Sequence, residues 1–298
     1  MQGLTYAFRF IRACFSLALK NPRLRKPGLY LLMGGVSVLV VWIFPLGVVT
    51  ALLGVRPLAM ALIGLFAILL LFVLLALGEA IAMETCLVFD DLIRTELPSP
   101  EINPEKRSFT HWGKAFLWAL ILPGLHTIQF VDQVFRPKHA SKRDWLGAAY
   151  LMLPVISIED RDLKDAQERI TDMVRNHLVR FHPDLVRVRL VAGVVQWTLI
   201  LCGGALGVWA GLAIAGPEVA GVLARLLAIA IGLVLGGIPA LLGIGFGGFC
   251  RACYYTSLYQ WALNVAFARL SGDTGHSLPP AILSQVLRTT HPSKKEEA

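Results

Sequence analysis

The residues best suited to chemistry are acids and sulfur atoms that directly follow a long apolar run. Four of them recur at helical spacing and so share one helix face: Glu79, Met83, Cys86 and Asp90. Ionisable groups at membrane depth are costly, and they commonly line a proton or ion path. Because the uncharged run 57–78 is already long enough to cross a membrane, we favour a solvated helix end here, with Glu79 paired to Arg94 or Lys114.

A histidine inside an apolar stretch is the second candidate for handling protons or anions. His126 lies within 115–131, and its imidazole would titrate near neutral pH. The alternative is a histidine that is simply hydrogen-bonded within a helix bundle, which is the commoner case. The candidate polar path therefore consists of Glu79, Glu84, His126 and Gln129.

Two cysteines three residues apart are the only other pattern with catalytic potential. Zinc sites usually need a second ligand pair, so we interpret Cys250 and Cys253 as incidental small residues, with metal or redox chemistry as the alternative. The segment 243–248 matches the bare dinucleotide-binding pattern, but it lies in an apolar run without the required strand, and we treat the match as chance. The sequence thus assigns no catalytic residue, no metal and no cofactor.

Glycines recur at four-residue spacing in the two C-terminal apolar runs. Small residues at this spacing allow helix backbones to approach closely in lipid. The residues expected to pack in this way are Gly203, Gly207, Gly211, Gly232 and Gly236. The spacing does not distinguish packing within the chain from packing between subunits.

The elements that would position these residues are four long uncharged runs. They are 29–55, 57–78, 190–217 and 226–250, and each exceeds the roughly 20 residues that cross a hydrocarbon core. Of the 298 residues, 56% are hydrophobic and 16% are charged, which excludes a soluble enzyme and a disulfide scaffold. We predict an all-α, polytopic membrane helical bundle with four full crossings, a partly inserted helical hairpin and amphipathic interfacial helices.

The basic residues predict an orientation. If both termini are cytoplasmic, 26 of the 28 Lys and Arg residues lie on one side, as the positive-inside rule requires. We therefore expect a multi-pass protein of the cell inner membrane with cytoplasmic N- and C-termini. Six basic residues precede the first crossing and would contact anionic lipid headgroups: Arg9, Arg12, Lys20, Arg23, Arg25 and Lys26. No aromatic-interleaved basic face is present, so no nucleic acid is expected.

The domain prediction has three parts. Residues 1–28 form a basic amphipathic interfacial arm, whose apolar stripe comprises Leu4, Phe8, Ile11, Phe15 and Leu19. Residues 29–271 form the membrane domain, and 272–298 form a polar cytoplasmic tail. Within the membrane domain we expect crossings at about 29–55, 57–90, 186–217 and 221–263, a hairpin at 112–158 that dips into the membrane, and an amphipathic helix at 161–182.

Three short motifs resemble a known group of proteins. They are Lys20-Asn21-Pro22, Leu153-Pro154-Val155-Ile156 with Glu159-Asp160, and Leu258-Tyr259-Gln260-Trp261-Ala262. Over residues 1–265 the chain resembles a loosely defined set of uncharacterised prokaryotic integral membrane proteins, distantly similar to the bacterial sulfate-uptake channel family. The resemblance implies long crossings and partly inserted helices, and for the channel family it also implies oligomers that pass a small anion.

These observations lead to three functional hypotheses. The first is a non-catalytic accessory or scaffold subunit of a prokaryotic membrane assembly, whose partners are membrane lipids and either other membrane protein subunits or the chain itself. The second is a small-anion channel or transporter that acts as a homo-oligomer. A membrane enzyme is the third, and it depends on the acids near Glu79 and on the Cys250 and Cys253 pair.

Overall fold

The structure is a computed structural model that describes residues 2–53, 57–93, 150–176, 183–214 and 222–271. Across these ranges the chain forms seven helices, so the all-α prediction is confirmed. The tail 272–298 and most of the predicted hairpin, including His126 and Gln129, lie outside the described residues.

Four helices are long and apolar enough to cross a membrane. They are α2 (Pro22–Leu53), α3 (Pro57–Ile93), α8 (Pro183–Ile214) and α9 (Val222–Ser271). Proline stands first in three of them, where its missing amide hydrogen costs no helical hydrogen bond. The length and hydropathy of these four helices make the chain a multi-pass membrane protein.

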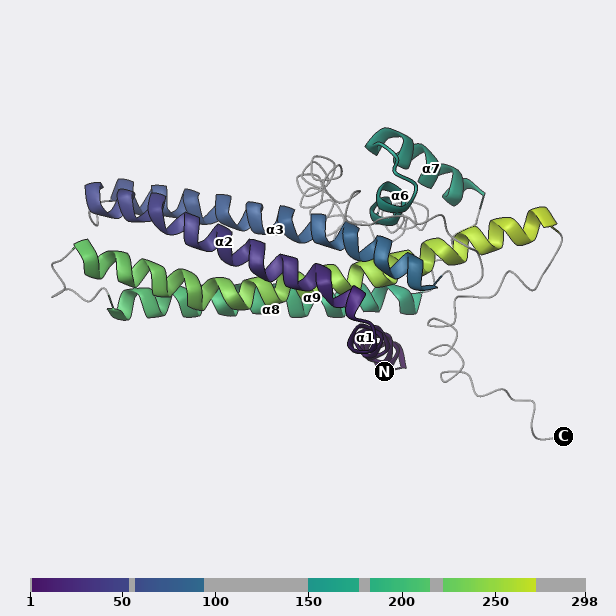
Figure 1. Ribbon diagram of the computed structural model, residues 1–298, viewed down its shortest axis with the longest axis horizontal. Coiled ribbons are helices and arrows are strands. Elements are labelled where there is room, and N and C mark those ends of the chain that lie inside the picture. The colour runs from purple at the N-terminus through teal and green to yellow at the C-terminus, as the bar shows by residue number, and fades with distance from the viewer. Residues whose placement is uncertain (1, 54–56, 94–149, 177–182, 215–221, 272–298) are drawn as a thin grey trace.

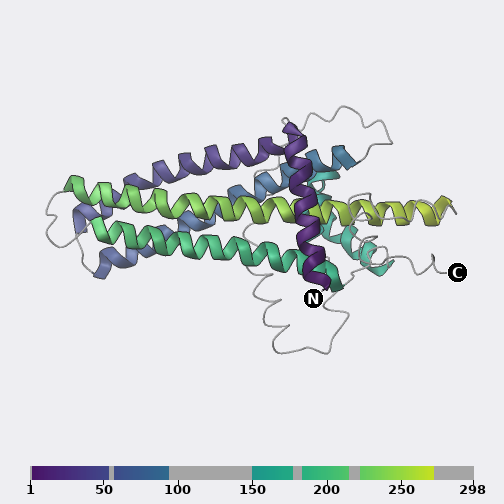
Figure 2. The same ribbon diagram turned by 90° about the horizontal axis from the view of Figure 1, so that it is seen from below.

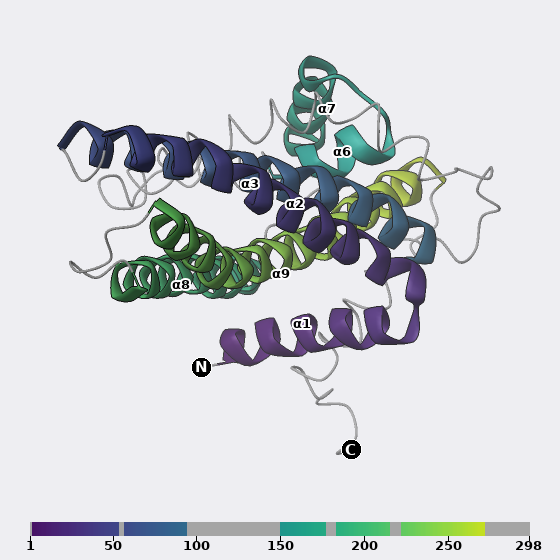
Figure 3. The ribbon, with the colours of Figure 1, turned by 60° about the vertical axis from the view of Figure 1, so that its left-hand side comes forward.

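The helix α9 is the centre of the arrangement. It contacts α2 and α3 on one side and α8 on the other, and α2 and α3 also contact each other. The four helices run side by side along the long axis of the molecule (Figure 1), with α2 and α3 above α8 and α9 in the view of Figure 3. The extensive contacts of α8 are with α9 and with the N-terminal helix.

Three shorter helices gather near one end of the bundle. The helix α1 (Gln2–Lys20) lies across the long helices (Figure 2), and it ends immediately before Asn21 and Pro22. The helices α6 (Met152–Ile158) and α7 (Leu163–Arg175) lie on the α3 side. The helix α6 belongs to the end of the predicted hairpin, and α7 occupies part of the predicted amphipathic segment 161–182.

The buried residues form two cores. The smaller core joins the spanning parts of α2, α3, α8 and α9 around Leu74, Leu241 and Ile244. The larger core lies where α1, α6 and α7 meet the ends of α3, α8 and α9, and it includes Phe10 and Phe89. Only 22–33% of the most apolar window of each spanning helix is buried, as expected for helices whose apolar surface faces lipid. The best-packed part of the protein is therefore the end that carries the polar residues of interest.

Candidate functional site

A buried ion pair joins two of the long helices. Arg251 of α9 donates through Nη2 to Oε1 of Glu79 on α3 at 2.6 Å, and their side chains are only 11% and 4% exposed. The favoured interpretation of Glu79 as a solvated helix end is therefore wrong. The apolar run ends at Gly78 as expected, but α3 continues to Ile93, and its contact with α9 brings Arg251 to the acid.

Helix length places this pair at the edge of the hydrocarbon layer. At about 1.5 Å per residue, Glu79 lies about 33 Å along α3 from Pro57, and Arg251 lies about 38 Å along α9 from Leu226. A hydrocarbon core is about 30 Å thick. The charges thus stand just past the boundary, where the cost of burying them is smaller than at the membrane centre.

A second buried carboxylate lies three helical turns further along α3. Asp90 is 7% exposed, and it accepts a short hydrogen bond from Nε2 of Gln260 on α9. Glu84 is also buried, at 7% exposure, and has an interaction partner. Glu79 and Asp90 thus add two polar contacts to the otherwise apolar packing of α3 on α9.

An arginine and four aromatic residues form the neighbouring part of this region. The guanidinium of Arg189, at the start of the spanning part of α8, lies 4.0 Å from the ring centre of Tyr150. Tyr150 stacks on Tyr255 of α9 at 5.5 Å, and Phe10 of α1 meets Tyr254 edge-on at 5.8 Å. Burial is the largest influence on the Tyr150 hydroxyl and raises its pKa, against a smaller lowering by Arg189.

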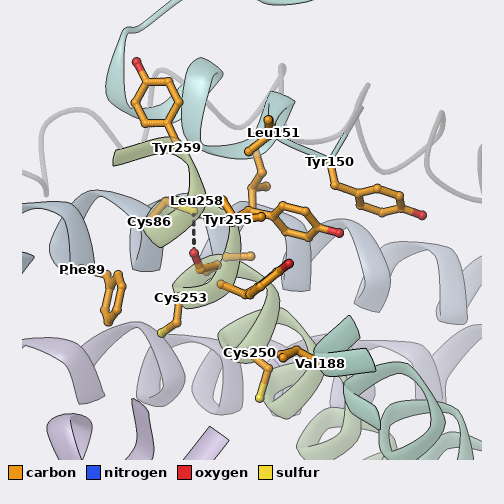
Figure 4. Packing of buried hydrophobic residues seen from close by; sticks show 14 of the residues in the cluster. Cys86, Phe89, Tyr150, Leu151, Val188, Cys250, Cys253, Tyr255, Leu258 and Tyr259 are labelled. Atoms are coloured by element: carbon orange, nitrogen blue, oxygen red, sulfur yellow. Dashed lines mark hydrogen bonds between the residues drawn. The ribbon is translucent and has the colours of Figure 1, made fainter. Parts of the chain in front are cut away.

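Four of the five cysteines lie in the larger core. Cys86 contacts the carbonyl oxygen of Ala252 at 3.8 Å (Figure 4), and Cys14 and Cys253 are both fully buried. Cys250 is 1% exposed and lies nearby on α9. Among the described residues, no group of three or more His, Cys, Asp or Glu side chains is arranged to hold a metal ion.

A glutamate at the end of α6 connects three helices. Glu159 accepts hydrogen bonds from the hydroxyl of Tyr259 on α9 and from Nε of Arg169 on α7, the latter at 3.3 Å, and it pairs with Arg161. Burial by itself would raise the pKa of Glu159. The hydrogen bond from Tyr259 and the two guanidinium groups outweigh burial and lower that pKa below the usual 4.5. The ionised carboxylate therefore holds α6, α7 and α9 together.

The glycine pattern lies at the α8–α9 contact. A methyl group on Gly203 would lie 2.8 Å from the carbonyl oxygen of Gly236, and one on Gly232 would lie 2.8 Å from that of Gly207. Gly211 faces Ala228 in the same antiparallel register. These glycines thus allow close packing between two helices of the same chain.

Gln196 continues this register toward the polar end of the bundle. Gln196 is 6% exposed, its side chain occupies the space left by Gly247, and its backbone carbonyl oxygen lies against Gly243. The glycine run that matches the dinucleotide-binding pattern is therefore part of a helix contact.

The remaining predicted site residues are basic and exposed. All six residues of the arm have exposed side chains: Arg9, Arg12, Lys20, Arg23, Arg25 and Lys26. Arg23 lies 3.8 Å from Asp91 of α3, and both side chains of this pair are more than half exposed.

Sequence reasoning missed the partners of the buried acids. Arg251 and Gln260 follow the last apolar run, and nothing in that run marks them as buried. Gln196 had a usable signal, because it is a polar residue inside the uncharged run 190–217.

No protein-family model, curated protein or solved structure matches the chain. The resemblance to the sulfate-uptake channels is therefore supported only as far as a helical protein with four candidate membrane spans. Fold and site together define a multi-pass α-helical membrane protein with a buried polar region at one end of its bundle.

Proposed function

We propose that the chain is a non-catalytic accessory or scaffold subunit of a prokaryotic inner-membrane assembly. The observation that carries this proposal is the pairing of buried acids across helices: Glu79 with Arg251, and Asp90 with Gln260. A catalytic acid instead faces a space that a substrate can enter. Groups engaged in such pairs hold helices in place.

The exposed side of α8 offers a surface on which a partner subunit could bind. Its extensive contacts are with α9 and α1, so one side of the helix faces outward along its length. Trp197, Leu201 and Trp209 on that side are 45%, 67% and 69% exposed. Tryptophan is enriched among residues that contribute most to protein–protein binding. We propose that this surface packs against another membrane subunit.

A homo-oligomeric small-anion channel is the second candidate. The observation that favours it is the common depth of Arg189 and Arg251, since Arg189 also lies about 38 Å along its helix from the far end, at Ile214. Because Arg251 is neutralised by Glu79, the Arg189 side chains are the cations that would repeat around one mouth of a symmetric oligomer and attract anions.

Photo-cross-linking in native membranes tests the α8 surface. A benzophenone amino acid at Leu201 should give an adduct with a different polypeptide, whereas one at the neighbouring Ile200, which is 8% exposed, should give none. An adduct with a second copy of the chain would favour the channel. Adducts with lipid alone would overturn α8 as a docking surface.

A further inference from the structure

The helix α1 presents two adjacent apolar faces, of which one is packed against the rest of the protein and the other is largely exposed. The packed face carries Tyr6, Ala7, Phe10, Cys14 and Ala18, each at most 7% exposed. The stripe predicted from the sequence is a different face. Of its five residues only Ile11 is buried, at 8% exposure, and it lies at the border between the two faces.

The second face is apolar and exposed. Leu4, Phe8, Phe15 and Leu19 are 48%, 61%, 37% and 71% exposed. At 100° per residue these four side chains project within one narrow sector of the helix, adjacent to the packed face. Large apolar side chains that are gathered and exposed in this way mark a contact with a membrane or a partner.

The third face is polar and cationic. Arg9, Arg12 and Lys20 project from the next sector, together with Thr5 and Ser16, and all five are exposed. The helix contains no acidic residue. An exposed apolar stripe flanked by basic residues is the pattern of helices that lie in the membrane interface.

Aromatic contacts fix which way the exposed stripe faces. Phe15, which belongs to the stripe, lies 5.6 Å from Phe246 and 5.0 Å from Phe249 between ring centres. Phe10, on the packed face, instead meets Tyr254, further from the spanning half of α9. The stripe is thus turned toward the spanning half of the bundle, and α1 crosses the long helices (Figure 2).

Lipid is the occupant that this arrangement fits. Leu190, at the start of the spanning part of α8, is 58% exposed, and α8 contacts α1, so the stripe continues the apolar surface of the spanning helices. We propose that α1 lies in the membrane plane, with Leu4, Phe8, Phe15 and Leu19 among the acyl chains and Arg9, Arg12 and Lys20 at the phosphates of anionic phospholipids. The inference goes beyond the scaffold function and does not depend on it.

Thiol accessibility in lipid nanodiscs tests the depth of the stripe. In a Cys202→Ser background, Phe8→Cys and Ser16→Cys each add one exposed thiol, while the four remaining native cysteines are buried. A charged maleimide should label Phe8→Cys on the order of tenfold more slowly than Ser16→Cys, because the apolar face lies below the headgroups. Both variants should label equally fast in denaturing detergent. Equal rates in the nanodisc would overturn the proposal and favour a protein partner on the stripe.

Binding of phosphatidylglycerol tests the cationic face. Titration of the purified full chain, followed by native mass spectrometry, should show about 30-fold weaker binding for R9Q/R12Q, the factor expected for two charges worth about 1 kcal/mol each. The matched control K164Q/R175Q removes the same charge from exposed positions on α7 and should leave binding unchanged. Equal losses in the two double variants, or no loss in either, would contradict a headgroup site on α1.

Discussion

The buried pair of Glu79 and Arg251 gives the sharpest energetic prediction. The side chain of Arg251 is 11% exposed, so in the variant Glu79→Gln its guanidinium would be left among helices without a compensating charge. Removal of one partner from a buried ion pair typically costs about 3–5 kcal/mol, because the other charge stays desolvated. We expect this loss in the free energy of unfolding, measured by titration with sodium dodecyl sulfate in mixed micelles and followed by tryptophan fluorescence.

Two further variants make the interpretation specific. Replacing both partners, as Glu79→Leu/Arg251→Leu, removes the desolvation cost together with the attraction, so this variant should be more stable than Glu79→Gln. The matched control Asp91→Asn breaks the exposed pair with Arg23, at 3.8 Å, and should cost roughly 0–1 kcal/mol. The reasoning fails if Glu79→Gln unfolds within about 1 kcal/mol of the unaltered protein or if the double variant is the least stable.

Four other substitutions have defined outcomes in the same unfolding assay. Gly207→Ala should destabilise the folded protein by about 1–3 kcal/mol, because the added methyl group meets the backbone of α9. Gly204→Ala should instead stabilise the folded protein by about 0.5–1 kcal/mol, because no atom lies within 4 Å of the added methyl group. Changes of the same sign in both variants would contradict the helix contact. Gln260→Leu should cost about 1–3 kcal/mol because the buried Asp90 loses a donor, and an unchanged midpoint would count against that hydrogen bond. Because the pKa of Glu159 is lowered in the folded state, its contribution to the free energy of unfolding is complete above the usual pKa of 4.5 and is lost as the pH falls through the pKa of the folded state. Glu159→Gln should remove this dependence of stability on acid pH. An identical pH profile of stability in the variant and the unaltered protein would refute the prediction.

The membrane architecture could be predicted because it depends on local properties. Hydropathy and length alone identify a crossing, and the four runs found in the sequence correspond to α2, α3, α8 and α9. Periodicity likewise predicted that α1 is amphipathic. It could not show which face packs, because Phe10 and Phe15 lie on two different apolar sectors and only the tertiary contacts distinguish them.

The polar site could be predicted only in part, because its contacts join distant parts of the chain. Glu79 and Arg251 are 172 residues apart, and Asp90 and Gln260 are 170 apart, so no local spacing connects them. The glycine spacing in α8 and α9 predicts close helix packing, but it does not identify the helix that each glycine contacts. The tertiary structure shows that Gly203 of α8 packs against α9 of the same chain. The error about Glu79 has the same origin, since its ion-pair partner, Arg251, comes from the distant helix α9.

Intact mass measurement of the native assembly tests the proposed scaffold role most directly. The full chain would be extracted with its surrounding lipid into polymer-bounded discs and released in the mass spectrometer, with Leu201→Arg on the exposed side of α8 as the comparison variant. The account predicts a different polypeptide bound in fixed stoichiometry to the unaltered chain and lost from the variant. A chain that is found alone, or only with further copies of itself, would contradict the accessory-subunit assignment.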